Sequence, residues 1–449
     1  MEQQNQNFTE GKILSPLIRF ALPILLALFL QSMYGAVDLL IVGQFSDAAG
    51  VSAVSTGSQA MMFLTMVVAG LSMGSTILLA RRIGEGRPEA CGQVVGTSVA
   101  LFATIGLVVA VGMQFLSAPA ARVLQAPAQA FDQTVAYIRI CCGGALFIVA
   151  YNLLGGIFRG MGNSKLPLIT VAIACVVNIA GDLLLVGGFG MGAAGAAIAT
   201  VFAQAVSVVL SLIIIRKKGL PFAFSLRQVG FHTSTVREIV KLGSPIALQD
   251  ALVGISFLVI LAIVNQLGVI VSAGIGVAEK ICGFVMLVPS AFNQAMSAFV
   301  GQNMGAEKPE RAKKALWYGI LTGLSLSVVI AYVTFFHGDL LSAIFSRDTA
   351  VIAASSEYLK AYAVDCLLVS FLFCFMGYFN GCGRTTFVMA QGILGAFCVR
   401  IPVSYWMSRA AQPSLFHIGL ATPASSVVQI LLCVGYFLLM ERRRREREL

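Results

Sequence analysis

The chain has 449 residues, of which 58% are hydrophobic and 11% are charged, whereas soluble domains contain roughly 25% charged residues. So few charges cannot cover the surface of a soluble globule, which excludes that class and indicates a protein that faces lipid. The formal net charge of +10 does not indicate a nucleic-acid partner, because the basic residues lie in short loops and in the tail, as the positive-inside rule expects.

Apolar segments follow one another along the chain, each near or above the roughly 20 residues that a spanning helix needs. Twelve of them are expected to span, at 13–43, 51–80, 91–117, 129–160, 165–186, 191–216, 235–266, 272–302, 311–338, 350–382, 385–409 and 415–441. Lysine and arginine gather in alternate loops and in the tail, so both termini are expected in the cytoplasm. The sequence therefore predicts an all-α, multi-pass protein of the cell (inner) membrane.

The sequence repeats itself with a period of nearly half its length. The segment GEGRPE at 84–89 returns as GAEKPE at 305–310, an offset of 221, and near the start Pro23 returns as Pro245, an offset of 222. Each half holds six spans, an even number, so the halves are expected to be parallel repeats, as in transporters whose substrate path lies between repeats. The expected domains are an N-lobe over 1–216, a cytoplasmic linker over 217–234, a C-lobe over 235–441 and a basic cytoplasmic tail over 442–449.

Ionisable side chains at membrane depth are costly, so each is a functional candidate. Four polar residues of the first half are expected at a similar depth in the membrane, in the outer half of their predicted spans: Asp38, Asn178, Asp182 and Thr200. Asn178 precedes Asp182 by one helical turn, so both share a face. Two carboxylates, an amide oxygen and a hydroxyl form an all-oxygen site that suits a hard monovalent cation, or a proton shared by the carboxylates. The alternative is a pair of hydrated acids near the interface.

The second half carries another set of charges in its spans, Asp250, Glu279, Lys280, Asp365 and Arg400. A buried salt-bridge network and a substrate or second ion site both remain open for this set. Asp250 is the least neutralised, so it is the better functional candidate. Pro23 on the first span is expected to act as a hinge or a static kink, because proline frees a carbonyl and bends a helix.

Catalytic and nucleotide-binding motifs are absent from the sequence. The three histidines, His232, His337 and His417, form no paired metal motif, and no Walker A sequence is present. The ten cysteines lack metal-ligand spacing and are interpreted as small core hydrophobes. We therefore expect no enzyme, no cofactor and no direct use of ATP.

The paired loops and turns resemble those of a transporter family. Both halves carry Gly-x-x-x-Pro-Glu after their second span, and the turns RGMGN at 159–163 and NGCGR at 380–384 follow the fourth span of each half. Together with twelve spans in two repeats, these motifs resemble the MATE (multidrug and toxic compound extrusion) family over residues 13–441.

The resemblance implies two six-helix lobes that form a V, and a secondary active exporter that works by alternating access. It implies that inward H⁺ or Na⁺ drives export of amphipathic, often cationic compounds. It also implies, by similarity to one prokaryotic branch, a cation site at Asp38, Asn178, Asp182 and Thr200, a hinge at Pro23, and a substrate cavity lined by Gln31, Tyr34, Tyr137 and Asn152. Asp250 is added to that cavity, and no metal is expected beyond Na⁺ at the cation site. Sodium-coupled members of another branch carry an acid where this chain has Val253.

Three alternatives differ in their chemistry. A flippase for lipid-linked saccharides, from the same superfamily, would need a strongly cationic cavity, whereas the bases Lys280 and Arg400 have acids to pair with. An integral membrane enzyme such as an acyltransferase would need a histidine or metal constellation, and a channel would need a filter-like segment. The expected partners are small amphipathic substrates and membrane lipid, and the chain is expected to be a monomer.

Overall fold

The chain is helical throughout its spans. This computed structural model describes residues 8–410 and 414–448. Within these residues, eleven helices are long and apolar enough to cross a membrane, and a bent pair of helices supplies a twelfth span. The predicted all-α membrane fold with twelve spans is confirmed.

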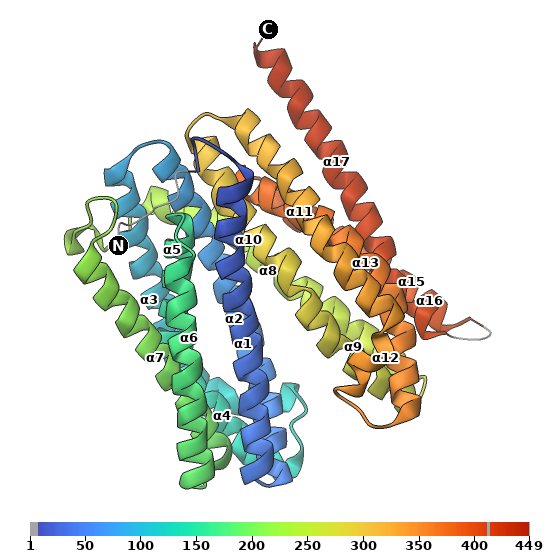
Figure 1. Cartoon of the computed structure of the whole chain (residues 1–449). Coiled ribbons are helices and arrows are strands. Elements are labelled where there is room, and N and C mark those ends of the chain that lie inside the picture. The colour runs from blue at the N-terminus through green and yellow to red at the C-terminus, as the bar shows by residue number, and fades with distance from the viewer. Residues whose placement is uncertain (1–7, 411–413, 449) are drawn as a thin grey trace. The chain divides into compact units, whose positions relative to one another are not determined.

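The first six spans contain seven α-helices (blue to green in Figure 1). They are α1 (Leu14–Phe45), α2 (Ala48–Gly84), α3 (Pro88–Val123), α4 (Phe131–Gly143), α5 (Ala145–Gly160), α6 (Lys165–Asp182) and α7 (Gly192–Lys218). A π-helix, η2 (Leu183–Gly188), continues α6, and short 3₁₀ turns lie at η1 (Ala128–Ala130) and η3 (Leu226–Gln228).

The last six spans contain ten α-helices (yellow to red in Figure 1). They are α8 (Thr233–Asn265), α9 (Val269–Val285), α10 (Leu287–Gly305), α11 (Pro309–Phe336), α12 (Gly338–Ala343), α13 (Thr349–Gly381), α14 (Thr385–Ile393), α15 (Ile401–Ser408), α16 (Leu415–Gly419) and α17 (Ala421–Glu448). A second π-helix, η4 (Leu394–Arg400), joins α14 to α15.

Internal contacts divide the chain into two compact units. The first unit contains Ile18–Ala247 together with the segment that ends at Gly11 and with Gly301–Glu307; the second contains Lys12–Leu17, Leu248–Val300 and the residues from Lys308 onward. The beginning of α8 and the end of α10 therefore pack with the first repeat. The lobes and linker expected from the sequence stay a prediction, and Leu449 of the expected tail lies outside the described residues.

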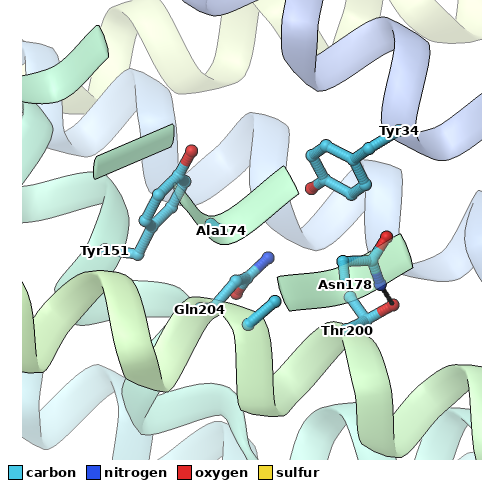
Figure 2. Close-up of a pocket in the computed structure, with 7 residues that line it drawn as sticks. Tyr34, Tyr151, Ala174, Asn178, Thr200 and Gln204 are labelled. Atoms are coloured by element: carbon cyan, nitrogen blue, oxygen red, sulfur yellow. Dashed lines mark hydrogen bonds between the residues drawn. The ribbon is translucent and has the colours of Figure 1, made fainter. Parts of the chain in front are cut away.

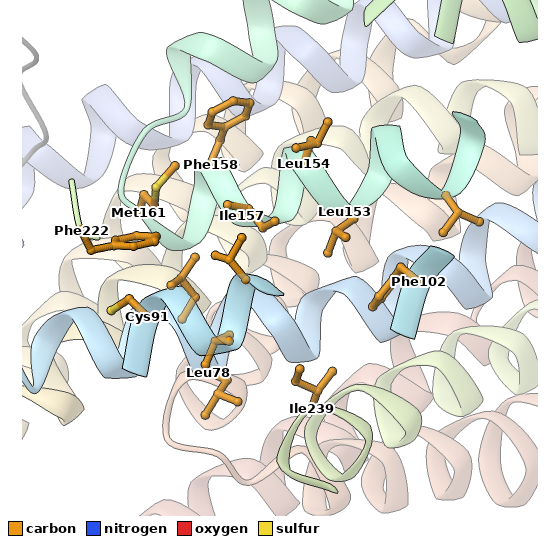
Figure 3. Packing of buried hydrophobic residues seen from close by; sticks show 14 of the residues in the cluster. Leu78, Cys91, Phe102, Leu153, Leu154, Ile157, Phe158, Met161, Phe222 and Ile239 are labelled. Carbon is orange, nitrogen blue, oxygen red and sulfur yellow. The ribbon is translucent and has the colours of Figure 1, made fainter. Parts of the chain in front are cut away.

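A core of apolar side chains ties α2, α3 and α5 together in the first unit (Figure 3). Leu78 of α2, Phe102 of α3 and Phe158 of α5 are among its fully buried members. Since lipid tails are as apolar as these side chains, such a core is stabilised by close van der Waals packing rather than by escape from water. Small residues allow that closeness: a Cβ added at Gly156 of α5 would lie 2.4 Å from the Ser72 hydroxyl of α2.

The repeated glycines at 84 and 305 have a shared physical cause. A Cβ at Gly84 would lie 1.9 Å from the carbonyl oxygen of Gln302, and one at Gly305 would lie 2.1 Å from the carbonyl oxygen of Arg81. The two contacts are equivalent, because the offset of 221 that relates Gly84 to Gly305 also relates Arg81 to Gln302. The end of α2 and the end of α10 meet backbone to backbone, and neither position has room for a side chain.

The segment before α1 is anchored inside the first unit by Phe8. Its ring is fully buried and stands edge-on to Phe20, with centroids 5.0 Å apart. The Phe8 carbonyl accepts a hydrogen bond of 3.1 Å from Asn303 Nδ2. A Cβ at Gly162 would lie 3.2 Å from the Phe8 ring, so this residue also packs on the turn after α5.

Two kinds of irregularity interrupt the spans. The fourth span is bent by 53° between α4 and α5, at Gly144, where an added Cβ would lie 2.2 Å from Val201. The π-helix η4 lies directly before Pro402, which cannot donate the α-helical hydrogen bond to the carbonyl four residues back. By contrast, α1 continues without a break through Pro23.

Candidate functional site

Three helices of the first unit position the four predicted cation-site residues. Asp38 lies on α1, Asn178 and Asp182 lie one turn apart on α6, and Thr200 lies on α7. Asp182 is the last α-helical residue before η2. A π-helical turn holds one residue more than an α-helical turn, and such turns are frequent at functional sites.

The two carboxyl groups are buried and lie together. The side chain of Asp38 is 6% exposed and that of Asp182 is 0% exposed. The two carboxyl groups are close enough to influence each other directly. Two like charges so close and so far from water cannot both persist without a proton or a cation between them.

The oxygen atoms around this pair lack donors. Asp38 Oδ1, Asn178 Oδ1 and both carboxyl oxygens of Asp182 are buried and accept no hydrogen bond from any described residue. Asn178 Nδ2 donates to Thr200 Oγ1 over 3.4 Å, which turns the amide oxygen of Asn178 away from α7. Buried oxygens are normally satisfied, so this all-oxygen set fits a small hard cation or a proton.

A small pocket lies between α1, α5, α6 and α7 (Figure 2). It has room for about one water-sized group. Its lining residues are Tyr34, Tyr151, Ala174, Asn178, Thr200, Ala203 and Gln204. Asn178 and Thr200 belong both to the pocket and to the predicted cation site, so the two are continuous.

The structure adds Tyr151 and Gln204 to the residues found from the sequence. Gln204 lies one helical turn after Thr200, and its Oε1 is buried without a donor among the described residues. Its side chain also interacts with the Tyr34 hydroxyl. Gln204 was not among the residues predicted from the sequence, although its helical spacing from Thr200 is a signal that could have indicated it. For Tyr151 the only signal was its place beside Asn152.

The residues predicted to line a substrate cavity have different surroundings. Gln31 Nε2 donates to the Tyr151 hydroxyl over 2.6 Å, and Tyr34 lines the pocket. Tyr137 is buried, and its hydroxyl lies 3.2 Å from that of Ser58. Both Tyr34 and Tyr137 are close enough to Asp38 to interact with it electrostatically.

The other two predicted cavity residues, Asn152 and Asp250, form no hydrogen bond with the first three within the described part of the chain. Asn152 Nδ2 donates to the Ile148 carbonyl of its own helix over 2.8 Å. Asp250 is half-buried on α8 and belongs to the second unit. The cavity role of all five residues stays a prediction.

Across residues 8–410 and 414–448, no group of three or more histidine, cysteine, aspartate or glutamate side chains is placed to hold a metal ion. The oxygen set at Asp38, Asn178, Asp182 and Thr200 stays a predicted cation site.

A family model matches both halves of the chain. The MatE model matches residues 23–184 and again residues 245–406, which together make up well over half of the sequence. The two matches start 222 residues apart and end 222 residues apart, so the doubling noted in the sequence is a doubling of the family unit.

Curated relatives are similar over nearly their whole length. Probable multidrug resistance protein YoeA of Bacillus subtilis is 24% identical over 433 residues, which cover 95% of this chain and 94% of that protein. Probable multidrug resistance protein YpnP of the same organism is 26% identical over 91% and 90% of the two chains. Multidrug export protein MepA of Staphylococcus aureus (strain N315) is 23% identical over 91% and 90%.

Solved structures share the fold. A MATE crystal structure in complex with MaL6 superposes with a TM-score of 0.92 over 100% of both chains, at 19% identity. The outward-facing conformation of a multidrug resistance MATE family transporter of the MOP superfamily gives a TM-score of 0.91 over 99% and 98%, also at 19% identity. At this identity the likeness shows the architecture, twelve helices in two lobes.

Proposed function

The chain belongs to the MATE family, and from this premise we propose that it is a secondary active multidrug exporter that exchanges external H⁺ or Na⁺ for organic compounds. It is an integral, multi-pass membrane protein, and its curated relatives are named as multidrug resistance and export proteins. The proposed substrates are amphipathic, often cationic molecules. We place the protein in the cell membrane with both termini in the cytoplasm, as a monomer that needs no cofactor.

The observation that carries this proposal is the pair of buried carboxyl groups at Asp38 and Asp182. With the neighbouring oxygens of Asn178 and Thr200, they form a site whose net negative charge is stable only when a proton or cation is present. Binding at this site is thus a change of charge inside the first unit, between α1 and α6. A change of that kind favours one packing of the two helices over another.

Exchange requires that the ion and the substrate favour different conformations. In the proposed cycle, ion binding draws the carboxyl groups of α1 and α6 together and substrate leaves outward. Release of the ion on the cytoplasmic side leaves two buried negative charges that repel each other, and substrate then binds from the cytoplasm or the inner leaflet. Pro23 on α1 is the proposed hinge, because it lacks the hydrogen bond that would stiffen that helix.

The pocket beside Asn178 and Thr200 holds only about one water-sized group, so it does not admit a drug-sized molecule. We assign it to the ion and its hydration. Gln31 and Tyr34 are predicted cavity residues that contact the pocket residues Tyr151 and Gln204. We propose that these contacts couple ion binding in the pocket to substrate binding in the cavity.

The test is dye efflux from proteoliposomes with an imposed pH gradient or an imposed sodium gradient. Asp38→Asn keeps the shape of the side chain but removes its charge, so gradient-driven efflux should fall to the level of empty liposomes. Asp132→Asn is the matched control, because Asp132 is exposed at the start of α4, and it should transport like the parent protein.

The two gradients give separate outcomes. Stimulation by one gradient alone identifies the coupling ion. Full efflux by the Asp38→Asn protein would overturn the cation-site assignment, and efflux that responds to neither gradient in the parent protein would overturn exchange itself.

A further inference from the structure

The cation site has a counterpart in the second repeat. The two matches to the family model are offset by 222 residues, and the same offset aligns Ala199-Thr200 with Ala421-Thr422. The offset of 222 holds at both ends of the family match, near Tyr34 and near Asn178, whereas the loops at 84 and 305 are offset by 221. Five of the seven pocket residues of the first unit then correspond as follows: Tyr34 to Ser256, Ala174 to Ala396, Asn178 to Arg400, Thr200 to Thr422 and Gln204 to Ser426.

One of these corresponding residues, Ser256, contacts the guanidinium of Arg400 in the second unit. Arg400 is 7% exposed, and its Nη1 donates to Ser256 Oγ over 3.4 Å. The Ser256 hydroxyl donates in turn to the Val253 carbonyl over 2.7 Å, which leaves its oxygen free to accept. The ring of Phe257 lies beneath the guanidinium, 4.6 Å from Arg400 Cζ.

The corresponding residues differ in size and in charge. In the first unit Tyr34 and Gln204 are large and Asn178 is small; in the second unit two serines, Ser256 and Ser426, replace the large pair and arginine replaces the small one. The second repeat thus carries a guanidinium-bearing side chain at the position that Asn178 holds in the first.

The charges follow the same exchange. At the offset of 222, Asp38 and Asp182 correspond to Ile260 and Ser404, both buried, so the second copy has lost both acids of the first. A different carboxylate faces the site: Asp365 of α13, 1% exposed, interacts electrostatically with Arg400 and contacts Ser426. Asp365 Oδ1 and Arg400 Nε have no hydrogen-bond partner among the described residues.

We propose that Arg400 is a tethered cation that permanently occupies the second copy of the cation site. Asp365, Ser256 and the Phe257 ring form the surroundings of a monovalent cation, and the arginine side chain supplies that cation from within the chain. The second unit is then held in a single charge state, and the coupling ion enters and leaves the first unit alone. This inference rests on the proposed cation site of the first unit, but its test measures stability and guanidinium binding and does not depend on which ion is transported.

A buried ion pair with no relation to an ion site is the competing interpretation, and chemical rescue separates the two. Arg400→Ala removes the tether and its charge and leaves Asp365 buried and unpaired, which is strongly destabilising. If the surroundings are those of a cation site, free guanidinium should bind in the vacated space. The apparent Tm of the purified full-length variant should then rise and saturate with millimolar guanidinium chloride, but not with choline chloride at equal ionic strength.

Arg409→Ala is the matched control, because Arg409 also stacks on an aromatic ring, that of Tyr405 at 5.1 Å, but is exposed. Guanidinium should bind the Arg400→Ala protein at least about tenfold more tightly than it binds the Arg409→Ala protein. Equal responses of the two variants, or equal effects of guanidinium and choline on Arg400→Ala, would overturn the proposal.

A double variant keeps the test decisive if Arg400→Ala does not fold. Asp365→Asn combined with Arg400→Ala removes the acid that requires a cation, so the double variant should be more stable than Arg400→Ala and should not respond to guanidinium. A double variant no more stable than the single one would contradict the tethered-cation role. Because the readout is stability and binding, a failure of the Asp38→Asn efflux test would leave this result unchanged.

Discussion

Thr200 contributes a single hydroxyl to the site, yet it determines how the neighbouring amide is oriented. Asn178 can present either its oxygen or its nitrogen to the carboxyl pair. By accepting from Asn178 Nδ2, Thr200 keeps the amide nitrogen on the side of α7 and the amide oxygen on the other side. An amide nitrogen in that place would repel a cation.

Replacing Thr200 by valine keeps the shape and removes the acceptor. We expect Thr200→Val to weaken binding of the coupling ion by about fivefold, since a hydrogen bond of this type contributes about 1 kcal/mol. The half-saturating ion concentration for dye efflux measures the change. Thr104→Val is the control, because Thr104 is exposed and donates only to its own helix; an equal effect in both variants would show that the Thr200 hydroxyl has no special role.

At this scale the sequence was informative about the acids and less so about their neighbours. Asp38 and Asp182 were found because charge is rare in spans and because both fall at the same depth. Which side chains these acids and their counterparts contact depends on the local geometry of α6 and α14. A π-helical turn rotates the residues that follow it to another face of the helix. The sequence patterns did not predict the two π-helices, η2 and η4.

Among the helices, the close approach of α2 and α10 is the contact least tolerant of change. Gly84→Ala would place a methyl group 1.9 Å from the carbonyl oxygen of Gln302, so the helix ends must separate. We expect a loss of roughly 1–3 kcal/mol of stability, measured as a lower Tm and a lower yield of folded protein.

Gly112→Ala is the control for this substitution. Nothing lies within 4 Å of a Cβ at Gly112, inside α3, so alanine there should be neutral or slightly stabilising. A Gly84→Ala protein as stable as Gly112→Ala would show that the two helix ends are not in close contact.

The broken fourth span shows what sequence patterns miss at the level of an element. One helix was expected over 129–160, and the structure has α4 and α5 with a bend of 53°. The adjacent glycines 143 and 144 permitted a break, but the cause is Val201 of α7, which packs where a Gly144 side chain would be. Because Val201 is distant from Gly144 in the sequence, local patterns do not show this contact. The corresponding helix of the second repeat, α13, is unbroken and carries Asp365 in this region.

For the molecule as a whole, the architecture followed from composition because lipid permits few solutions. A chain with so few charges must satisfy its backbone internally, and long apolar segments in water-free surroundings form helices. The count of twelve spans and the two repeats could therefore be predicted. The assignment of the start of α8 and the end of α10 to the first unit could not, because it depends on which helices pack most closely.

Orientation in the membrane is testable with reporters at the end of the chain. The basic residues of the tail predict a cytoplasmic C-terminus, so a fluorescent protein fused after Leu449 should fluoresce and alkaline phosphatase fused there should be inactive. The control is the same phosphatase fused after Asp348, in a loop expected on the opposite side, where it should be active. The reverse pattern would invert the proposed topology.

The anchoring of Phe8 has a consequence for biosynthesis. The partner of its carbonyl, Asn303, follows 295 residues later in the chain. At about 5–20 residues per second, the ribosome needs about 15–60 s to make that stretch. Throughout this time the spans of the first repeat are already emerging into the membrane, while the Phe8 carbonyl cannot yet accept this hydrogen bond. Phe8 is thus made well before Asn303, and the first unit cannot be complete until the second is more than a quarter made.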